Sequence, residues 1–194
     1  MILWIILSLL VIFIAVLLIR TLRFKPVKED LGPVADVTFD KEAAINSLAE
    51  LVKCKTVSYY DSSLEDKSEF DKLLRKLPKL YPYVIKTCEY TEFPDRGILF
   101  KWKGKTTGTK NPTVLMAHFD VVPVDKEHWT KPAFDGLIED GMLWGRGSLD
   151  TKSTFNGILF AANHLMSKGF QPENDIYFAF SGQEEINGPG AVNI

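Results

Sequence analysis

Five ionisable residues lie next to apolar segments of the chain, where folding can bring them together. They are His118, Asp120, Asp150, Glu184 and Glu185. Imidazole and carboxylate groups together suit Zn²⁺, and suit Mn²⁺ or Co²⁺ less well. Several carboxylates in one cleft repel each other strongly unless cations neutralise them. The residue types therefore indicate a metal centre.

The His-x-Asp pair comes directly after the apolar run 114–117. In an extended segment, residues i and i+2 point to the same face because the strand period is two. We therefore predict that His118 binds a metal ion, while Asp120 orients the imidazole ring and sets its tautomer.

The other three acids flank a predicted helix and a second apolar run. Asp150 follows the segment 145–149, whose two glycines permit tight turns, and its two carboxylate oxygens can bridge two cations. Glu184 and Glu185 follow the apolar run 176–180. In a turn, one of these neighbours can bind metal while the other acts as general base on a bound water.

Each motif also has a purely structural interpretation. A histidine after a strand is most often a loop residue with satisfied hydrogen bonds, and a Glu-Glu pair is most often solvated. His128 and His164 are expected in a loop and on a helix surface. The metal interpretation is favoured because the five residues recur together at the predicted carboxyl ends of neighbouring strands.

Hydrophobic periodicity predicts the elements that position these residues. Helices are expected at 40–53, at 63–77 with a Ser63-x-x-Asp66 cap, and at 151–168 before Gly169. Strands are expected at 83–90, 98–103, 113–122 (buried) and 175–180, with a surface loop at 104–112 and a hairpin at 137–144 around Asp140-Gly141. Because strand, helix and strand in this order form a parallel unit, the expected fold is α/β: a mixed, mainly parallel sheet flanked by helices.

The first 19 residues contain eighteen apolar residues, one serine and no charge. As a helix, this run is about 28 Å long, close to the hydrocarbon thickness of a bilayer. No Lys or Arg precedes Arg20 and no A-x-A cleavage pattern follows, so an uncleaved transmembrane anchor at 1–19 is expected. The basic residues of the next segment, a linker at 20–37, favour a single-pass membrane protein with its domain in the cytoplasm.

Composition and charge exclude several classes of protein. The net charge is −2, with both signs interspersed, so there is no basic stripe for nucleic acid and no such partner is expected. The 48 charged residues all lie outside the first 19, which excludes a wholly membranous protein (23 basic and 25 acidic). Cys54 and Cys88 belong to no C-x-x-C motif and are expected to be inert thiols.

Four motifs resemble, in order and spacing, those of the metallopeptidase family that includes aminoacylase, acetylornithine deacetylase, succinyl-diaminopimelate desuccinylase and carboxypeptidase S. They lie at 116–123, 129–136, 144–152 and 181–185. The resemblance covers roughly 40–194. The anchor and the segments 20–26 and 53–58 look most like the carboxypeptidase S (Gly-Xaa carboxypeptidase) branch.

This resemblance implies an incomplete zinc-peptidase-like catalytic domain at 38–194 and a site for two Zn²⁺ ions. His118 would be a terminal ligand of one zinc, Asp150 the bridging carboxylate and Glu185 a ligand of the other zinc. Glu184 would be the general base and Asp120 the partner that orients the histidine ring. The implied reaction is hydrolysis of an amide or peptide bond by a metal-activated water.

The family's further acidic ligand, its late histidine and its lid and dimerisation domain have no counterpart within 1–194. The chain alone is therefore expected to be inactive, and a homodimer is expected only with the lid domain. Expected substrates are a peptide, for a carboxypeptidase or dipeptidase, or an N-acyl amino acid, for an amidohydrolase. A non-catalytic, membrane-tethered binding module is the alternative from a different functional class.

Overall fold

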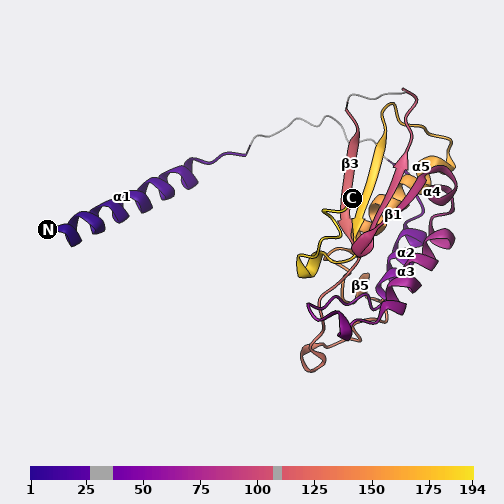
Figure 1. The fold of residues 1–194 in the computed structure, drawn as a ribbon, viewed down its shortest axis with the longest axis horizontal. Coiled ribbons are helices and arrows are strands. Elements are labelled where there is room, and N and C mark those ends of the chain that lie inside the picture. Colours follow the sequence, from indigo (N-terminus) through magenta and orange to yellow (C-terminus); the bar gives the residue numbers. More distant parts are fainter. Residues whose placement is uncertain (27–36, 107–110) are drawn as a thin grey trace. The chain divides into compact units, whose positions relative to one another are not determined.

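The computed structural model of the protein describes residues 1–26, 37–106 and 111–194. These residues form two compact units, Met1–Thr38 and Phe39–Ile194 (Figure 1). The first unit contains one long helix, and the second contains a sheet with its covering helices.

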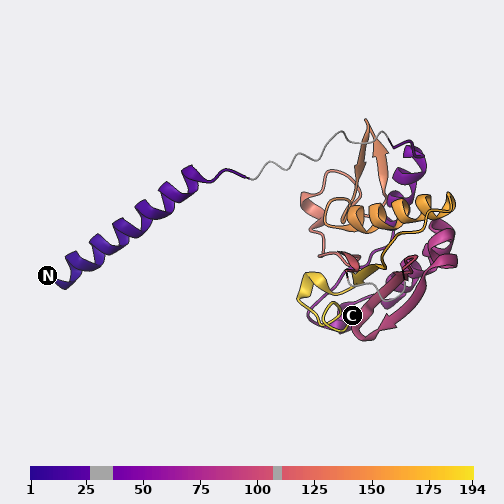
Figure 2. The same cartoon turned by 90° about the horizontal axis from the view of Figure 1, so that it is seen from above.

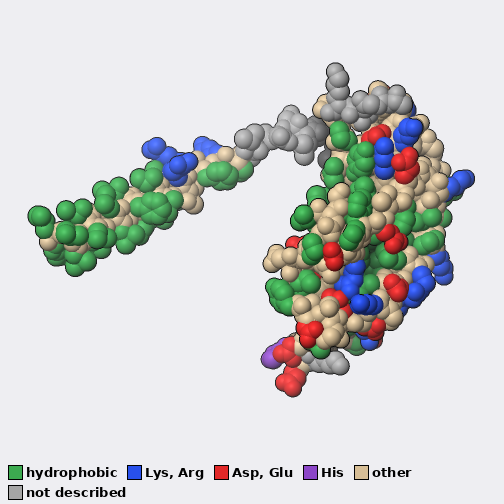
Figure 3. Space-filling view, viewed as in Figure 1, with side chains coloured by type: hydrophobic (Ala, Val, Ile, Leu, Met, Phe, Trp, Pro, Cys, Tyr) green, Lys and Arg blue, Asp and Glu red, His purple; other side chains and the backbone are tan. Residues whose placement is uncertain are grey.

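Helix α1 (Ile2–Arg23) has 22 residues, none of them buried. Hydrophobic side chains cover the visible face of this helix, and Lys and Arg side chains gather near its C-terminal end (Figure 3). It is long and apolar enough to cross a membrane, a property that signal sequences share. The helix continues to Arg23, past the predicted boundary at Ile19, and residues 27–36 of the predicted linker lie outside the described residues.

The second unit is built on a four-stranded mixed sheet with the order β1-β2-β6-β3. Its strands are β1 (Glu89–Phe93), β2 (Gly97–Trp102), β3 (Thr113–His118) and β6 (Ile176–Ser181). Strand β2 is antiparallel to both β1 and β6, whereas β3 and β6 are parallel. The parallel pair is joined through a helix, so polar residues after both strands meet at one edge.

The helices pack together beside this sheet (Figure 2). They are α2 (Lys41–Val52), α3 (Lys67–Leu80), α4 (Pro82–Thr87) and α5 (Lys152–Ser167). Helix α5 crosses from β3 to β6 and buries Phe155, whose ring centroid lies 4.5 Å from that of Phe180. The core is rich in aromatic residues, which bury large apolar areas and fix the position of α5 against the sheet.

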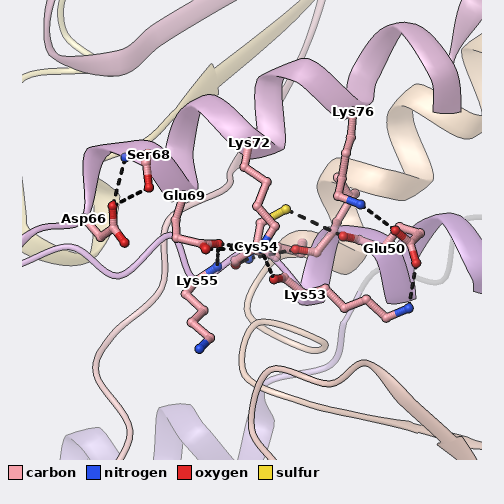
Figure 4. Close-up of polar contacts among 11 residues, drawn as sticks. Glu50, Lys53, Cys54, Lys55, Asp66, Ser68, Glu69, Lys72 and Lys76 are labelled. Atoms are coloured by element: carbon pink, nitrogen blue, oxygen red, sulfur yellow. Dashed lines mark hydrogen bonds and ion pairs between the residues drawn. The ribbon is translucent and has the colours of Figure 1, made fainter.

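Polar contacts tie α3 to the end of α2 (Figure 4). Lys72 Nζ donates to the Lys53 carbonyl oxygen at 2.9 Å, and Glu69 accepts from the backbone N–H of Lys55 at 2.7 Å.

A second sheet, the hairpin β4 (Leu137–Glu139) and β5 (Met142–Trp144), has the predicted turn at Asp140-Gly141. Both turn residues have positive φ, as a two-residue hairpin turn requires.

The mixed α/β fold with flanking helices is confirmed, but the expected majority of parallel pairs is wrong for the described strands. The chain returns through β1 and β2 as an antiparallel hairpin, so only β3–β6 is parallel. The predicted burial of the third strand is also wrong. Strand β3 lies at the end of the strand order, and Val114 and Met116 are 53% and 61% exposed.

Two predicted boundaries are wrong for local reasons. Most of the predicted strand 83–90 is helical, because Pro82 starts the short helix α4 and Val84 turns into the core, and strand β1 begins only at Glu89. Helix α3 starts at Lys67 instead of 63, because the side chain of Asp66 accepts the Ser68 N–H as an N-cap. Both thiols are free, as expected.

Substitution of Gly136 tests how closely the loop before β4 approaches α2, and substitution of Gly157 serves as its control. Gly136 has φ +56°, and an added Cβ would lie 2.5 Å from the Ala49 carbonyl oxygen, so Gly136→Ala should lower the free energy of unfolding by about 1–3 kcal/mol. Gly157 lies inside α5 with open space around it, so Gly157→Ala should raise that free energy by about 0.5–1 kcal/mol. Urea unfolding followed by far-UV circular dichroism measures both. Equal effects of the two substitutions would contradict the close approach at Gly136.

Candidate metal centre

The parallel pair β3–β6 brings polar residues from two strand ends to one edge of the sheet. His118, the last residue of β3, lies opposite Ser181, the last residue of β6. Glu184 and Glu185 begin a 3₁₀ turn shortly beyond β6. The predicted convergence of the strand ends therefore occurs.

Asp150 reaches the same place from the segment before α5. His118, Asp150 and Glu185 each offer one ligand atom, and these atoms all lie within 4.8 Å of one another. His118 Nε2 lies 3.2 Å from Asp150 Oδ1 and 3.6 Å from Glu184 Oε2. One imidazole and two carboxylates at this spacing fit a divalent cation, because Zn²⁺ is bound by these donors in tetrahedral sites.

Asp120 is fully buried and joins three segments through its carboxylate. Ser58 Oγ donates to Oδ2 at 2.8 Å, and the backbone N–H groups of Glu184 and Glu185 donate to Oδ1 and Oδ2 at 3.1 and 3.2 Å. We call these donors the Asp120 cage. They compensate the loss of water around a buried charge.

The contacts of His118 fix which ring nitrogen faces the cleft. Nδ1 lies 3.1 Å from the carbonyl oxygen of Asp120 and 3.4 Å from its Oδ1. Both atoms are acceptors, so Nδ1 carries a proton and Nε2 is directed towards Asp150 and Glu184. This is the ring orientation that a metal ligand requires.

The site carries an excess of negative charge. Burial disfavours the charged imidazole, but the hydrogen bonds and charge of Asp120 and the charge of Glu184 outweigh it and raise the pKa of His118 to about 9. Burial raises the pKa of Glu185, and the nearby Asp150, Asp120 and Glu184 raise it further, against the opposing effect of His118. A bound cation would compensate the same excess charge.

A cleft of about 370 Å³ opens over these residues. Its walls include His118, Asp150 and Glu184 together with apolar side chains from β3, β6 and the last residues of the chain. Glu184 is exposed, whereas Glu185 is half-buried. A larger cavity, about 670 Å³, lies along the 129–135 loop and is lined by none of the five residues.

The sequence analysis missed Ser58, which supplies the only side-chain hydroxyl of the cage. It is placed by the neighbouring backbone, where Ser58 N–H donates to the Val121 carbonyl oxygen at 3.1 Å and Val121 N–H donates to Thr56 at 2.9 Å. Thr56 and Ser58 are both buried. The polar residues 56 and 58 alternate with an apolar residue at 57, and residues i and i+2 share a face of an extended chain. This pattern was the available sequence signal that both hydroxyls lie on one face.

The sequence analysis also missed Lys152, which is buried and carries a charge. Its Nζ donates to the carbonyl oxygens of Leu51 and Cys54, at 3.1 and 2.6 Å, at the end of α2. Burial lowers the pKa of Lys152 to about 8. Because Lys152 begins α5, this contact fixes the position of the preceding segment, which carries Asp150.

The other two histidines lie away from these ligands. His128 is exposed in a loop and pairs with Asp125 at 2.8 Å, and His164 lies on α5 at the end opposite Asp150. Both placements agree with the expectation from sequence.

Comparisons with known proteins find relatives of this chain. Residues 114–194 match the model of peptidase family M20/M25/M40. The Dictyostelium discoideum protein "Probable carboxypeptidase S-like 2" is 36% identical over 199 residues, which cover 96% of this chain and 38% of that protein. Human N-fatty-acyl-amino acid synthase/hydrolase is 31% identical over 163 residues, which cover 80% of this chain and 32% of that protein.

Solved structures share the fold at lower sequence identity. Human carnosine dipeptidase 1 matches with a TM-score of 0.62 and 19% identity, over 79% of this chain and 34% of that one. A metallo-carboxypeptidase of the M20 family from Sulfolobus solfataricus matches with a TM-score of 0.58 and 22% identity, over 76% of this chain and 32% of that one.

The chain thus spans less than two-fifths of the length of these curated relatives, at 38% and 32%. The family resemblance inferred from the four sequence motifs is confirmed, including the likeness to carboxypeptidase S. Residues 114–194 of the chain thus form a match to peptidase family M20/M25/M40, and its relatives include a carboxypeptidase S-like protein.

Proposed function

We propose that this chain carries part of the catalytic site of a metal-dependent hydrolase of amide or peptide bonds, with Zn²⁺ as the metal. The observation that carries the proposal is the convergence of His118, Asp150 and Glu185 within 4.8 Å beside a cleft. The match to this family supports the same reaction class. Co²⁺ and Mn²⁺ suit the same donors less well.

In this proposal each residue of the site has a separate task. His118, Asp150 and Glu185 hold the metal, with Asp150 free to bridge to a second ion. When bound, the metal supplies Lewis-acid chemistry, polarising the scissile carbonyl and making water more acidic. Glu184 faces the cleft, takes a proton from the attacking water and returns it to the leaving amine. Asp120 keeps the proton of His118 on Nδ1.

Two substrate classes fit the site and its relatives. A carboxypeptidase or dipeptidase reaction is supported by the carboxypeptidase S-like relative. An N-acyl-amino-acid amidohydrolase is supported by the human relative named for N-fatty-acyl amino acids. The apolar walls that β3, β6 and residues 191 and 194 give the cleft suit an apolar substituent in either case.

We also propose that α1 is an uncleaved membrane anchor with the domain on the cytoplasmic side. The full chain should stay in the membrane pellet after alkaline carbonate washing, because the apolar helix can bury its whole length in lipid. A variant lacking residues 1–27 should move to the supernatant. Mass spectrometry that finds the first 20 or so residues removed from the purified protein would contradict an anchor and favour a signal sequence.

Substitution of the two neighbouring glutamates separates metal binding from proton transfer. Glu184→Gln keeps the size of the side chain and removes its basicity, so metal affinity should stay within about twofold while kcat falls by about 10² to 10⁴. Glu185→Gln removes a ligand charge, so metal affinity should fall by at least about tenfold. Competition with a chromogenic chelator measures affinity, and kcat is measured in the longest form of the protein that the gene encodes.

Glu42→Gln is the matched control, because Glu42 is an exposed residue of α2. It should change neither quantity. Metal loss with Glu184→Gln and metal retention with Glu185→Gln would exchange the two assignments. Unchanged metal affinity and rate in both variants would show that the acidic pair is a solvated turn.

A further inference from the structure

A buried ion pair lies close to the Asp120 cage without being part of it. The Glu65 side chain is 1% exposed, and Arg96 Nη2 donates to its Oε2 at 2.5 Å. The Arg96 guanidinium lies over the Phe70 ring, 3.8 Å from its centroid. Neither charged residue lines the cleft over the metal ligands. The position of this Glu65–Arg96 pair therefore needs another explanation.

We infer that the Glu65–Arg96 pair positions the metal centre by holding the two segments that donate hydrogen bonds to Asp120. The inference rests on the proposed function, because it requires His118, Asp150 and Glu185 to bind metal. It assigns to Glu65 and Arg96 a role in metal affinity although neither is a ligand.

The first segment is held by the Glu65 carboxylate. Its Oε1 accepts the backbone N–H of Tyr59 at 3.2 Å. Tyr59 follows Ser58, whose hydroxyl donates to Asp120 Oδ2 at 2.8 Å. Movement of the Glu65 carboxylate would therefore displace the hydroxyl donor of the cage through one peptide unit.

The second segment is held by the backbone of Arg96. Its carbonyl oxygen accepts the N–H of Gly182 at 3.1 Å. Gly182 lies two residues before Glu184, at the approach to the turn in which Glu184 and Glu185 donate their N–H groups to Asp120. The ion pair thus fixes Arg96 relative to Glu65. Through these two residues it also fixes the segment of Ser58 relative to the 184–185 turn.

Side-chain packing alone does not fix these segments. A cavity of about 470 Å³ lies beside the pair and is lined by Glu65, Phe70, Arg96, Phe119 and Gln183, among others. Arg96 Nη1 and Gln183 Oε1 are buried and have no hydrogen-bond partner among the described residues. Space next to the pair leaves the turn room to shift, so the directional bonds of the pair, more than close packing, determine its place.

Three substitutions separate the bonds of the pair from its charge. Glu65→Gln keeps an acceptor for Tyr59 and removes the ion pair. Arg96→Met keeps the apolar stem and removes the guanidinium. Arg96→Lys restores the charge without the planar fork of donors and serves as the conservative rescue. If one variant fails to fold by near-UV circular dichroism, the other two still decide the question.

Two controls distinguish positioning from loss of stability. Glu50→Gln removes another carboxylate, which pairs with Lys53 at the C-cap of α2 and with Lys76 on α3 (Figure 4). Ala162→Gly lowers stability through helix propensity at a buried position of α5, distant in sequence from Asp150. Neither substitution touches a contact of Asp120.

The full chain in detergent micelles is titrated with Co²⁺ alone. The dissociation constant and the visible absorption spectrum of bound Co²⁺ report the site, and thermal unfolding in EDTA reports stability. Glu65→Gln and Arg96→Met should weaken Co²⁺ binding about tenfold and alter the spectrum, and Arg96→Lys should recover part of the affinity. Both controls should bind Co²⁺ within about twofold of wild type.

Wild-type affinity in Glu65→Gln and Arg96→Met would overturn the inference while leaving the metal site intact. Equal loss of affinity in Ala162→Gly, at a matched unfolding temperature, would also overturn it, because stability alone would then explain the effect. Failure of the wild-type chain to bind Co²⁺ would overturn the proposed function and this inference together.

Discussion

The buried carboxylate of Asp120 is the constraint on which the rest of the site depends. A fully buried charge is tolerated only when hydrogen bonds replace its water, and here the donors come from Ser58 and from the amides of Glu184 and Glu185. The donors belong to segments more than 60 residues from Asp120 in sequence, at separations of 62, 64 and 65. Satisfying one carboxylate therefore brings the 58 segment and the 184–185 turn to the end of β3.

A buried cation places Asp150. Lys152 Nζ donates to the carbonyl oxygen of Leu51, in the last turn of α2, and to that of Cys54, two residues beyond the helix. The helix dipole favours positive charge at this end of α2. This contact fixes the start of α5 against α2. Asp150 comes directly before Thr151, the N-cap of α5. The candidate ligands on the strand side thus depend on a buried anion, and the candidate ligand on the helix side depends on a buried cation.

The sequence alone identified residues that have both a metal-binding side chain and a position next to a predicted strand or helix. His118, Asp150 and Glu185 are ionisable residues beside apolar runs or a predicted helix. The parallel β3–β6 pair brings His118 and the 184–185 turn together, and the segment before α5 adds Asp150. Residues whose role depends on distant partners could not be found this way. Lys152 is defined by α2, about 100 residues earlier, with separations of 101 and 98. Strand β2 lies close to the predicted 98–103, but β1 begins six residues later than the predicted 83, because Pro82 and Val84 belong to a helix where apolar periodicity suggested a strand.

The Asp120 cage also holds the two adjacent glutamates for which different tasks are proposed. Both backbone amides donate to the same carboxylate, which fixes the start of the turn. Glu185 is half-buried and belongs to the group of ligand atoms within 4.8 Å, whereas Glu184 is exposed and lines the cleft. Glu184 Oε2 is nevertheless only 3.6 Å from His118 Nε2, close enough to reach a water held at the ligands. A single buried residue, Asp120, therefore contacts the histidine ring and the backbone of both the candidate ligand and the candidate base.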